Sequence, residues 1–113
     1  MAITVRGLVR DMQAEVLATD LQPDRAAELL TKLTALLGNV LDEMRVADAD
    51  YNLVLLKHLE SEEAASRAKI RAETTAEYAR KREARDVHEL TVELIRSLKM
   101  FVRGKSDELR MTR

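Results

Sequence analysis

The chain has 113 residues, of which 35% are charged, three are Gly, one is Pro and none is Cys. An average soluble protein has roughly 25% charged residues, so this composition favours long, exposed helices. A net charge of −1 argues against a protein that coats nucleic acid by bulk charge. Without Cys, the chain has no disulfide, no thiolate metal site and no Cys nucleophile.

The small net charge hides an uneven distribution. Residues 1–65 contain six Lys or Arg and twelve Asp or Glu, whereas residues 66–113 contain thirteen and eight. An acidic segment that packs beside a basic one would explain this asymmetry, and it would set the orientation of the helices. The alternative is a basic half that contacts nucleic acid.

The first predicted helix spans about residues 4–19. Thr4 can cap this helix, and apolar residues follow it at helical spacing. Residues 19–23 then form a connection, because Pro23 is tolerated only in the first turn of a helix. A long second helix is predicted over about 23–73.

The second helix carries a coiled-coil seam, in which apolar residues keep a three-four spacing along one face. The seam residues expected to join protomers are Leu30, Leu33, Leu37, Val40, Met44, Ala47, Tyr51 and Val54. Leucines beside the seam widen the apolar face beyond what two helices bury, so we expect a homodimer or a higher oligomer. Gly38 costs about 1 kcal/mol relative to Ala, and we expect it to permit close approach of another backbone.

A third helix is predicted over about 75–103, because Thr74 and Glu77 have the spacing of a capping box. Gly104 is placed to end this helix, and a frayed tail would follow over 105–113. The predicted buried side of the helix consists of Val87, Leu90, Leu94, Ile95, Leu98, Phe101 and Val102.

These elements predict an all-α fold, with residues 1–113 in a single helical domain. We expect a long antiparallel helical hairpin or coiled coil with a short N-terminal helix, assembled into a helical-bundle oligomer. One unbroken helix from Pro23 to Arg103 is the alternative to the hairpin.

The two histidines, His58 and His88, are the first candidates for a metal or acid–base site. His58 and Glu62 have the i,i+4 spacing of a helical metal-ligand pair, but two ligands do not make a site, and a polar seam residue more often fixes register. His88 lies beside Glu89 without a nucleophile in a recognisable triad. The sequence therefore predicts no catalytic residue, no metal ligand and no cofactor.

Basic residues give the strongest indication of a binding surface. On a helix, cations three or four residues apart share a face and can follow phosphates, although nearby acidic residues can pair with the same cations. The residues expected to contact a partner or phosphate groups are Arg67, Lys69, Arg71, Arg80, Lys81, Arg82 and Arg85.

These features predict a non-enzymatic coiled-coil protein that self-associates and binds another macromolecule, which we expect to be a protein. Adaptors, scaffolds, inhibitors and small phage accessory proteins share this architecture. The alternative is a nucleic-acid-binding accessory protein that contacts phosphates through its basic 67–85 face. We expect a cytoplasmic protein without a membrane partner, because the longest apolar run, Leu53–Leu56, is far shorter than the roughly 18 residues of a membrane span.

Overall fold

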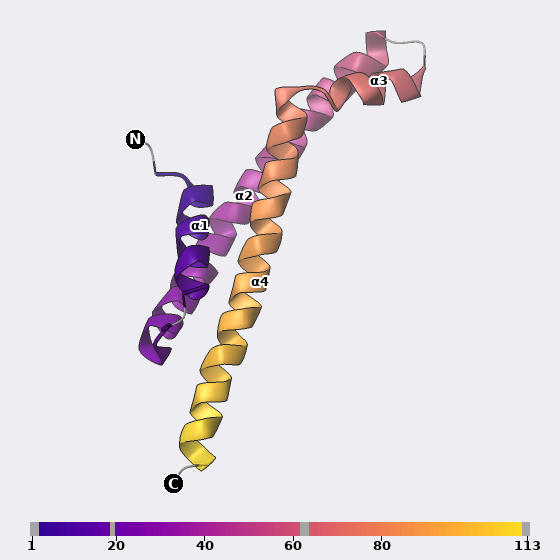
Figure 1. Cartoon of the computed structure of the whole chain (residues 1–113). Helices are drawn as coiled ribbons and strands as arrows, with labels where there is room; N and C mark the ends of the chain where they lie inside the picture. Colours follow the sequence, from indigo (N-terminus) through magenta and orange to yellow (C-terminus); the bar gives the residue numbers. More distant parts are fainter. Residues whose placement is uncertain (1–2, 19, 62–63, 112–113) are drawn as a thin grey trace. The chain divides into compact units, whose positions relative to one another are not determined.

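A computed structural model describes residues 3–18, 20–61 and 64–111. Over these ranges the chain forms helices and no strand, so the predicted all-α fold is confirmed (Figure 1). The helices are α1 (Val5–Val16), α2 (Pro23–Ser61), α3 (Ala65–Ala72) and α4 (Ala76–Met111). None of the described helices is long and apolar enough to cross a membrane.

The helices divide between two compact units. The first unit comprises Met1–Asn39 and Glu89–Arg113, and the second comprises Val40–His88. Both α2 and α4 therefore contribute to each unit. The sequence predicts a single domain over residues 1–113.

The first unit begins with α1, whose N-terminal cap is the predicted one. The Thr4 hydroxyl accepts a hydrogen bond of 2.9 Å from the Gly7 backbone N–H. This bond satisfies one of the four N–H groups that the first turn of a helix leaves without a partner. The helix ends at Val16, three residues before the predicted end, and Leu17 follows it with 74% of its surface exposed.

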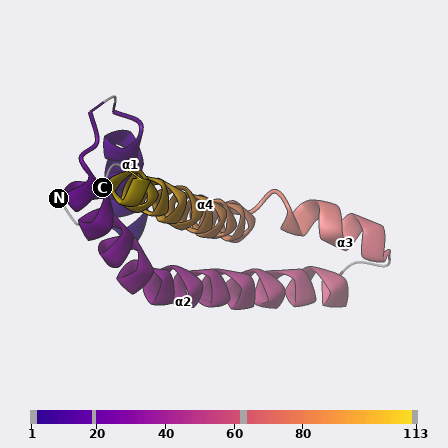
Figure 2. The ribbon, with the colours of Figure 1, turned by 90° about the horizontal axis from the view of Figure 1, so that it is seen from below.

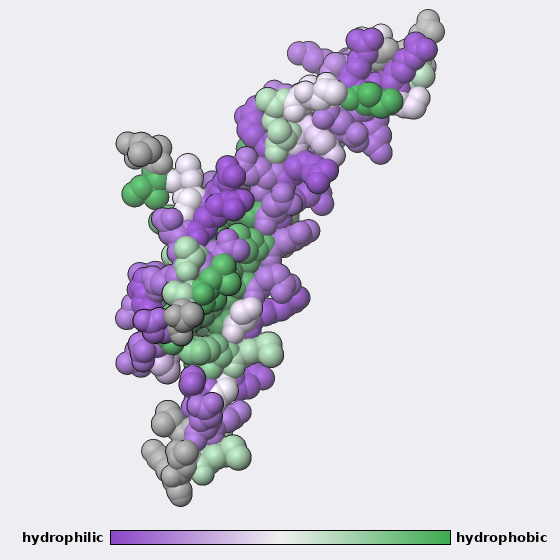
Figure 3. Space-filling view, in the orientation of Figure 1, coloured by the Kyte–Doolittle hydropathy of each residue, from purple (hydrophilic) through white to green (hydrophobic). Residues whose placement is uncertain are grey.

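The core of the first unit draws on three helices. Val9 of α1, Leu29 and Leu33 of α2 and Leu98 of α4 have at most 1% of their surface exposed. Figure 2 shows α1 next to the start of α2 and to the last part of α4, and Figure 3 shows apolar surface gathered between α1 and α4. The predicted buried side of α4 is confirmed, because its seven residues are all buried or half-buried.

The second unit contains an antiparallel hairpin of α2 and α4. Asp48 of α2 pairs with Arg85 of α4 at 3.3 Å, and Tyr51 packs against Tyr78 with the ring centroids 5.3 Å apart. A later residue of α2 therefore contacts an earlier residue of α4, as antiparallel helices require. The predicted hairpin is confirmed, and the unbroken helix from Pro23 to Arg103 is excluded.

The predicted helix over 23–73 is divided in the structure. α2 ends at Ser61, and α3 begins at Ala65 after Ala64, whose backbone is extended. The sequence around this break, residues 60–63, is polar. Ala68 and Ala72 of α3 are fully buried, and such small side chains allow close helix packing.

The next boundary lies near the predicted one but uses a different cap. Thr75, not Thr74, accepts a hydrogen bond from the Tyr78 backbone N–H, at 3.3 Å. The Thr74 hydroxyl instead donates to the Arg71 carbonyl at the end of α3, at 2.7 Å. The Thr cap of α4 is therefore one residue later than predicted, and it is not part of a capping box, because Tyr78 and not Glu or Gln stands three residues after Thr75.

The predicted end of the third helix is wrong. α4 continues through Gly104 to Met111, and Gly104 does not adopt the positive φ of a helix-ending Gly. Beyond it, Lys105 and Glu108 pair at 3.5 Å one turn apart, which supports the helix. Residues 105–111 are thus helical, while 112–113 lie outside the described residues.

Candidate interaction surfaces

The predicted seam faces the interior of both units. In the first unit Leu33 is buried, while Leu30 and Leu37 are half-buried. In the second unit the seam has two buried members, Val40 and Tyr51. Its half-buried members there are Met44, Ala47 and Val54. Contacts within the chain therefore cover much of the face that was expected to join protomers.

A second apolar stripe lies on α2 outside the seam, and sequence reasoning did not separate it. Val46, Leu53 and Leu56 have 61%, 66% and 52% of their surface exposed, and Ala49 between them is also exposed. Each of these four residues follows a seam residue by two positions, which is about 200° around a helix. They therefore form an outward stripe on the face of α2 opposite the seam.

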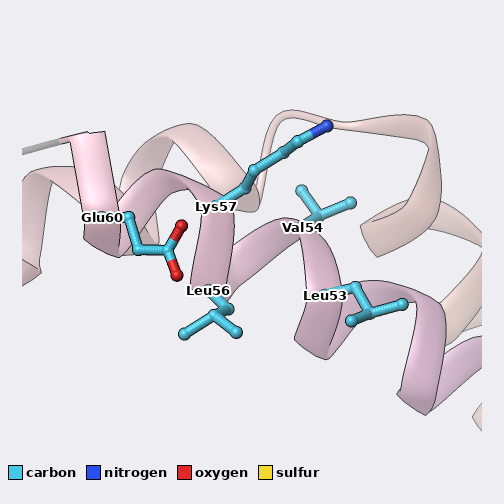
Figure 4. A pocket seen from close by; sticks show the side chains of 5 residues that line it. All are labelled: Leu53, Val54, Leu56, Lys57 and Glu60. Carbon is cyan, nitrogen blue, oxygen red and sulfur yellow. The ribbon is translucent and has the colours of Figure 1, made fainter.

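The outward stripe borders a shallow groove of about 280 Å³ (Figure 4). In the close-up, the side chains of Leu53 and Leu56 lie along the same side of α2. The lining residues are Leu53, Val54, Leu56, Lys57 and Glu60. A groove formed by one helix cannot enclose a small molecule, so its shape suits contact with another helix.

Charged side chains border the outward stripe. Glu43 and Lys57 are exposed and lie two heptads apart, so they share one side of it, with Asp50 between them. Arg45 is on the other side and pairs with Asp42 at 3.7 Å. Apolar residues flanked by charges in this way are typical of a helix that pairs with another helix.

The basic residues that were expected to contact a partner or phosphate groups lie on two helices of the second unit. Arg67, Lys69 and Arg71 are exposed on α3, which contains no acidic residue. The four other basic residues are on α4, beyond the break at residues 73–75. The cations of the 67–85 face are thus divided between two helices, as the helix boundary predicted near residues 73–75 requires.

The basic residues of α4 have partners within the second unit. Arg85 pairs with Asp48 as described, and Arg80 pairs with Glu77 at 3.4 Å. Lys81 lies 4.4 Å from the centroid of the Tyr51 ring, within the range of a cation–π contact. The expected packing of acidic against basic segments is therefore present in the Asp48–Arg85 pair.

Tyr51 and Tyr78 form the centre of this cluster. The Tyr78 hydroxyl bonds to Arg82 at 3.4 Å, and this bond raises the pKa of Arg82. Burial raises the pKa of Tyr51, with smaller contributions from Glu73 and Tyr78. Burial therefore favours the neutral form of Tyr51, and the hydrogen bond favours the charged form of Arg82.

The histidines occupy half-buried positions. His58 lies in the last turn of α2, where its backbone carbonyl accepts a hydrogen bond of 3.2 Å from the Ser61 hydroxyl. Its proposed companion, Glu62, lies outside the described residues, and His88 is half-buried on α4. Among the residues that the structure describes, no group of three or more His, Asp or Glu side chains is placed to hold a metal ion.

The first unit has an apolar groove of its own, of about 260 Å³, between the end of α1 and α4. Val16, Leu21, Leu98 and Phe101 supply most of its apolar lining. Met100 on α4 is 75% exposed. This groove is less regular than the outward stripe, because residues from a loop and two helices form it.

No protein-family model matches the chain, and neither a curated protein nor a solved structure matches it.

Proposed function

We propose that this chain is a non-catalytic helical protein that self-associates and acts by binding another protein, as an adaptor, scaffold or inhibitor does. The observation that carries this proposal is the outward stripe on α2. Full burial of a Leu or Val side chain is worth about 1.5–3 kcal/mol, so a row of exposed apolar residues at coiled-coil spacing favours association.

The outward stripe changes where the association surface is expected. Substitution of a seam residue such as Met44 would test folding as much as association, because the seam is half-buried or buried within the chain. Val46, Leu53 and Leu56 are exposed, so changes there leave the core of the unit intact. They are therefore the better probes of binding.

The test compares two variants with equal exposure in the same unit. Leu53→Asp places a charge in the outward stripe, and Ile70→Asp places one on α3, where Ile70 is 65% exposed against 66% for Leu53. Leu53→Asp should weaken self-association at least about tenfold, a loss of about 1.4 kcal/mol, while Ile70→Asp should leave it unchanged. Sedimentation equilibrium over a range of concentrations measures this difference.

Circular dichroism provides the control, because both variants should keep the helical signal of the wild type. A wild-type chain that stays monomeric at every concentration would contradict self-association. Equal weakening by both variants would show that the association does not use the outward stripe.

The alternative function is a nucleic-acid-binding accessory protein. It is supported by α3, where Arg67, Lys69 and Arg71 are exposed on a helix without acidic residues. Cations at this spacing can contact backbone phosphates without reading base sequence.

A further inference from the structure

The spacing of the outward stripe indicates what can cover it. Val46, Ala49, Leu53 and Leu56 follow one another by three, four and three residues, and this order reads the same in both directions. An identical helix that runs the opposite way therefore places Val46 across from Leu56 and Ala49 across from Leu53. A parallel copy would instead place each residue across from itself.

The side-chain sizes favour the antiparallel arrangement. Interfaces pack well when a large side chain lies across from a small one. In the antiparallel pair each Ala49 lies across from a Leu53, whereas in the parallel pair two Ala49 methyl groups would face each other and leave a gap. The four layers of the stripe are thus complementary to their own reversed copy.

We propose that a second copy of this chain covers the outward stripe, with the two α2 helices antiparallel about a two-fold axis between Ala49 and Leu53. This inference rests on the proposed self-association and specifies its geometry. The interface is isologous, so each residue pair occurs twice and the assembly closes as a dimer.

Charges beside the stripe support this geometry. Glu43 and Lys57 lie on the same side of α2, and the antiparallel arrangement brings Glu43 of each copy next to Lys57 of the other. The net charge of −1 adds little long-range repulsion between copies. In a parallel pair Arg45 would instead lie next to Asp50 of the other copy, so the two geometries use different ion pairs.

Other charges near the stripe lower the affinity of the dimer. Asp50 lies near its own copy at the two-fold axis, and the repulsion between these exposed carboxylates reduces affinity. Asp42 and Glu60 continue the three-four spacing at the two ends of the stripe, where they would face each other. The contact is therefore confined to four layers, and we expect a reversible dimer.

Charge reversal tests the geometry. Glu43→Lys or Lys57→Glu alone should weaken the dimer about fivefold, and the double variant should restore its affinity to within about twofold. Arg45→Asp combined with Asp50→Arg is the matched control, because this exchange restores an ion pair only in a parallel dimer. Rescue by the second exchange and not by the first would overturn the antiparallel arrangement.

The absence of Cys permits a second test by disulfide trapping. In the antiparallel dimer the two Val46 positions are about 15 Å apart along the axis, beyond the reach of a disulfide, while Val46 and Leu56 face each other. Val46→Cys mixed with Leu56→Cys should therefore crosslink under mild oxidation, and Val46→Cys alone should not.

These experiments distinguish a failure of the proposed self-association from a failure of the antiparallel geometry. A wild-type dimer with crosslinks in Val46→Cys alone would overturn the antiparallel geometry and leave self-association standing. A chain that is monomeric at all concentrations would overturn both. A dimer that neither Leu53→Asp nor these exchanges affect would place the interface elsewhere on the molecule.

Discussion

At the residue scale, the ion pair between Glu15 and Arg25 links α1 to α2 in the first unit. Arg25 donates through two nitrogens to the two Glu15 oxygens, at 2.5 and 2.9 Å, and it also bonds to Glu28 at 2.8 Å. A bidentate pair of this kind is more specific than a single contact. The hydrogen bonds from Arg25 lower the pKa of Glu15 below its ordinary value.

This pKa shift predicts how the stability of the first unit depends on pH. Because the pKa of Glu15 is lower in the folded chain than in the unfolded chain, its contribution is present above the unfolded pKa and is lost as the pH falls through the folded pKa. Glu15→Gln should therefore lower the melting temperature above the unfolded pKa of a Glu, about 4.3, and the difference from wild type should disappear as the pH falls through the lowered folded pKa. Thermal unfolding followed by circular dichroism measures both.

Glu93→Gln is the matched control for this prediction. Glu93 pairs with Arg96 at 2.9 Å, but that exposed pair lies within one turn of α4 and links no two helices. Glu93→Gln should have a smaller effect on melting at every pH. Equal effects of the two substitutions would show that the Glu15–Arg25 pair does not hold α1 to α2.

At the element scale, Gly38 lies in the interior of α2 at a position where neither the backbone conformation nor a close contact requires a glycine. A Cβ atom added at Gly38 would meet no other atom within 4 Å, and its φ angle is not positive. The expectation that Gly38 permits close approach of another backbone is therefore wrong within this chain. A helix-interior Gly without a packing role only destabilises its helix.

Gly38→Ala should raise the free energy of unfolding by about 1 kcal/mol, because Ala restricts the unfolded chain and favours the helix. Urea denaturation measures this gain. Gly7→Ala is the control, since its added Cβ would lie 3.1 Å from the Thr4 hydroxyl and crowd the cap of α1, so its gain should be smaller. A loss of stability in Gly38→Ala would mean that a second molecule packs against this position.

At the scale of the whole molecule, part of the uneven charge distribution is explained by contacts between acidic or aromatic and basic residues within the second unit. Asp48 and Arg85 join an acidic segment to a basic one, and Lys81 lies over the ring of Tyr51. These contacts involve Lys81 and Arg85 of α4, while Arg67 and Lys69 of α3 are exposed on a helix without acidic residues. The basic residues therefore differ in how readily they could serve an external partner.

This difference predicts weak binding of nucleic acid. We expect little binding of a labelled duplex oligonucleotide at physiological salt, because α3, whose exposed cations lie on a helix without acidic residues, is short. Fluorescence anisotropy between about 50 and 200 mM salt measures this. Tight binding that weakens steeply with salt and is lost in Arg67→Glu/Arg71→Glu would favour the nucleic-acid alternative.

The sequence by itself determined that the chain is helical, together with several details of its helices. Apolar spacing and the cap at Thr4 are local signals, because they depend on residues within one or two turns. The buried side of α4, including Leu94 and Leu98, was predictable for the same reason. Helix ends were less predictable. Thr74 and Thr75 are both suitable N-cap residues, and a glycine such as Gly104 occurs both inside helices and at their ends.

Only the tertiary structure decided which face of α2 is covered. Between Val40 and Leu59, α2 has apolar residues at coiled-coil spacing on two opposite faces, the seam and the outward stripe. The spacing alone does not say which of these two faces is buried within the chain. α4 and α3 complete one unit with the face that carries Tyr51, which leaves Leu53 and Leu56 exposed. The physical reason is that burial depends on contacts between residues far apart in the chain, such as Tyr51 with Tyr78, and no local pattern encodes them.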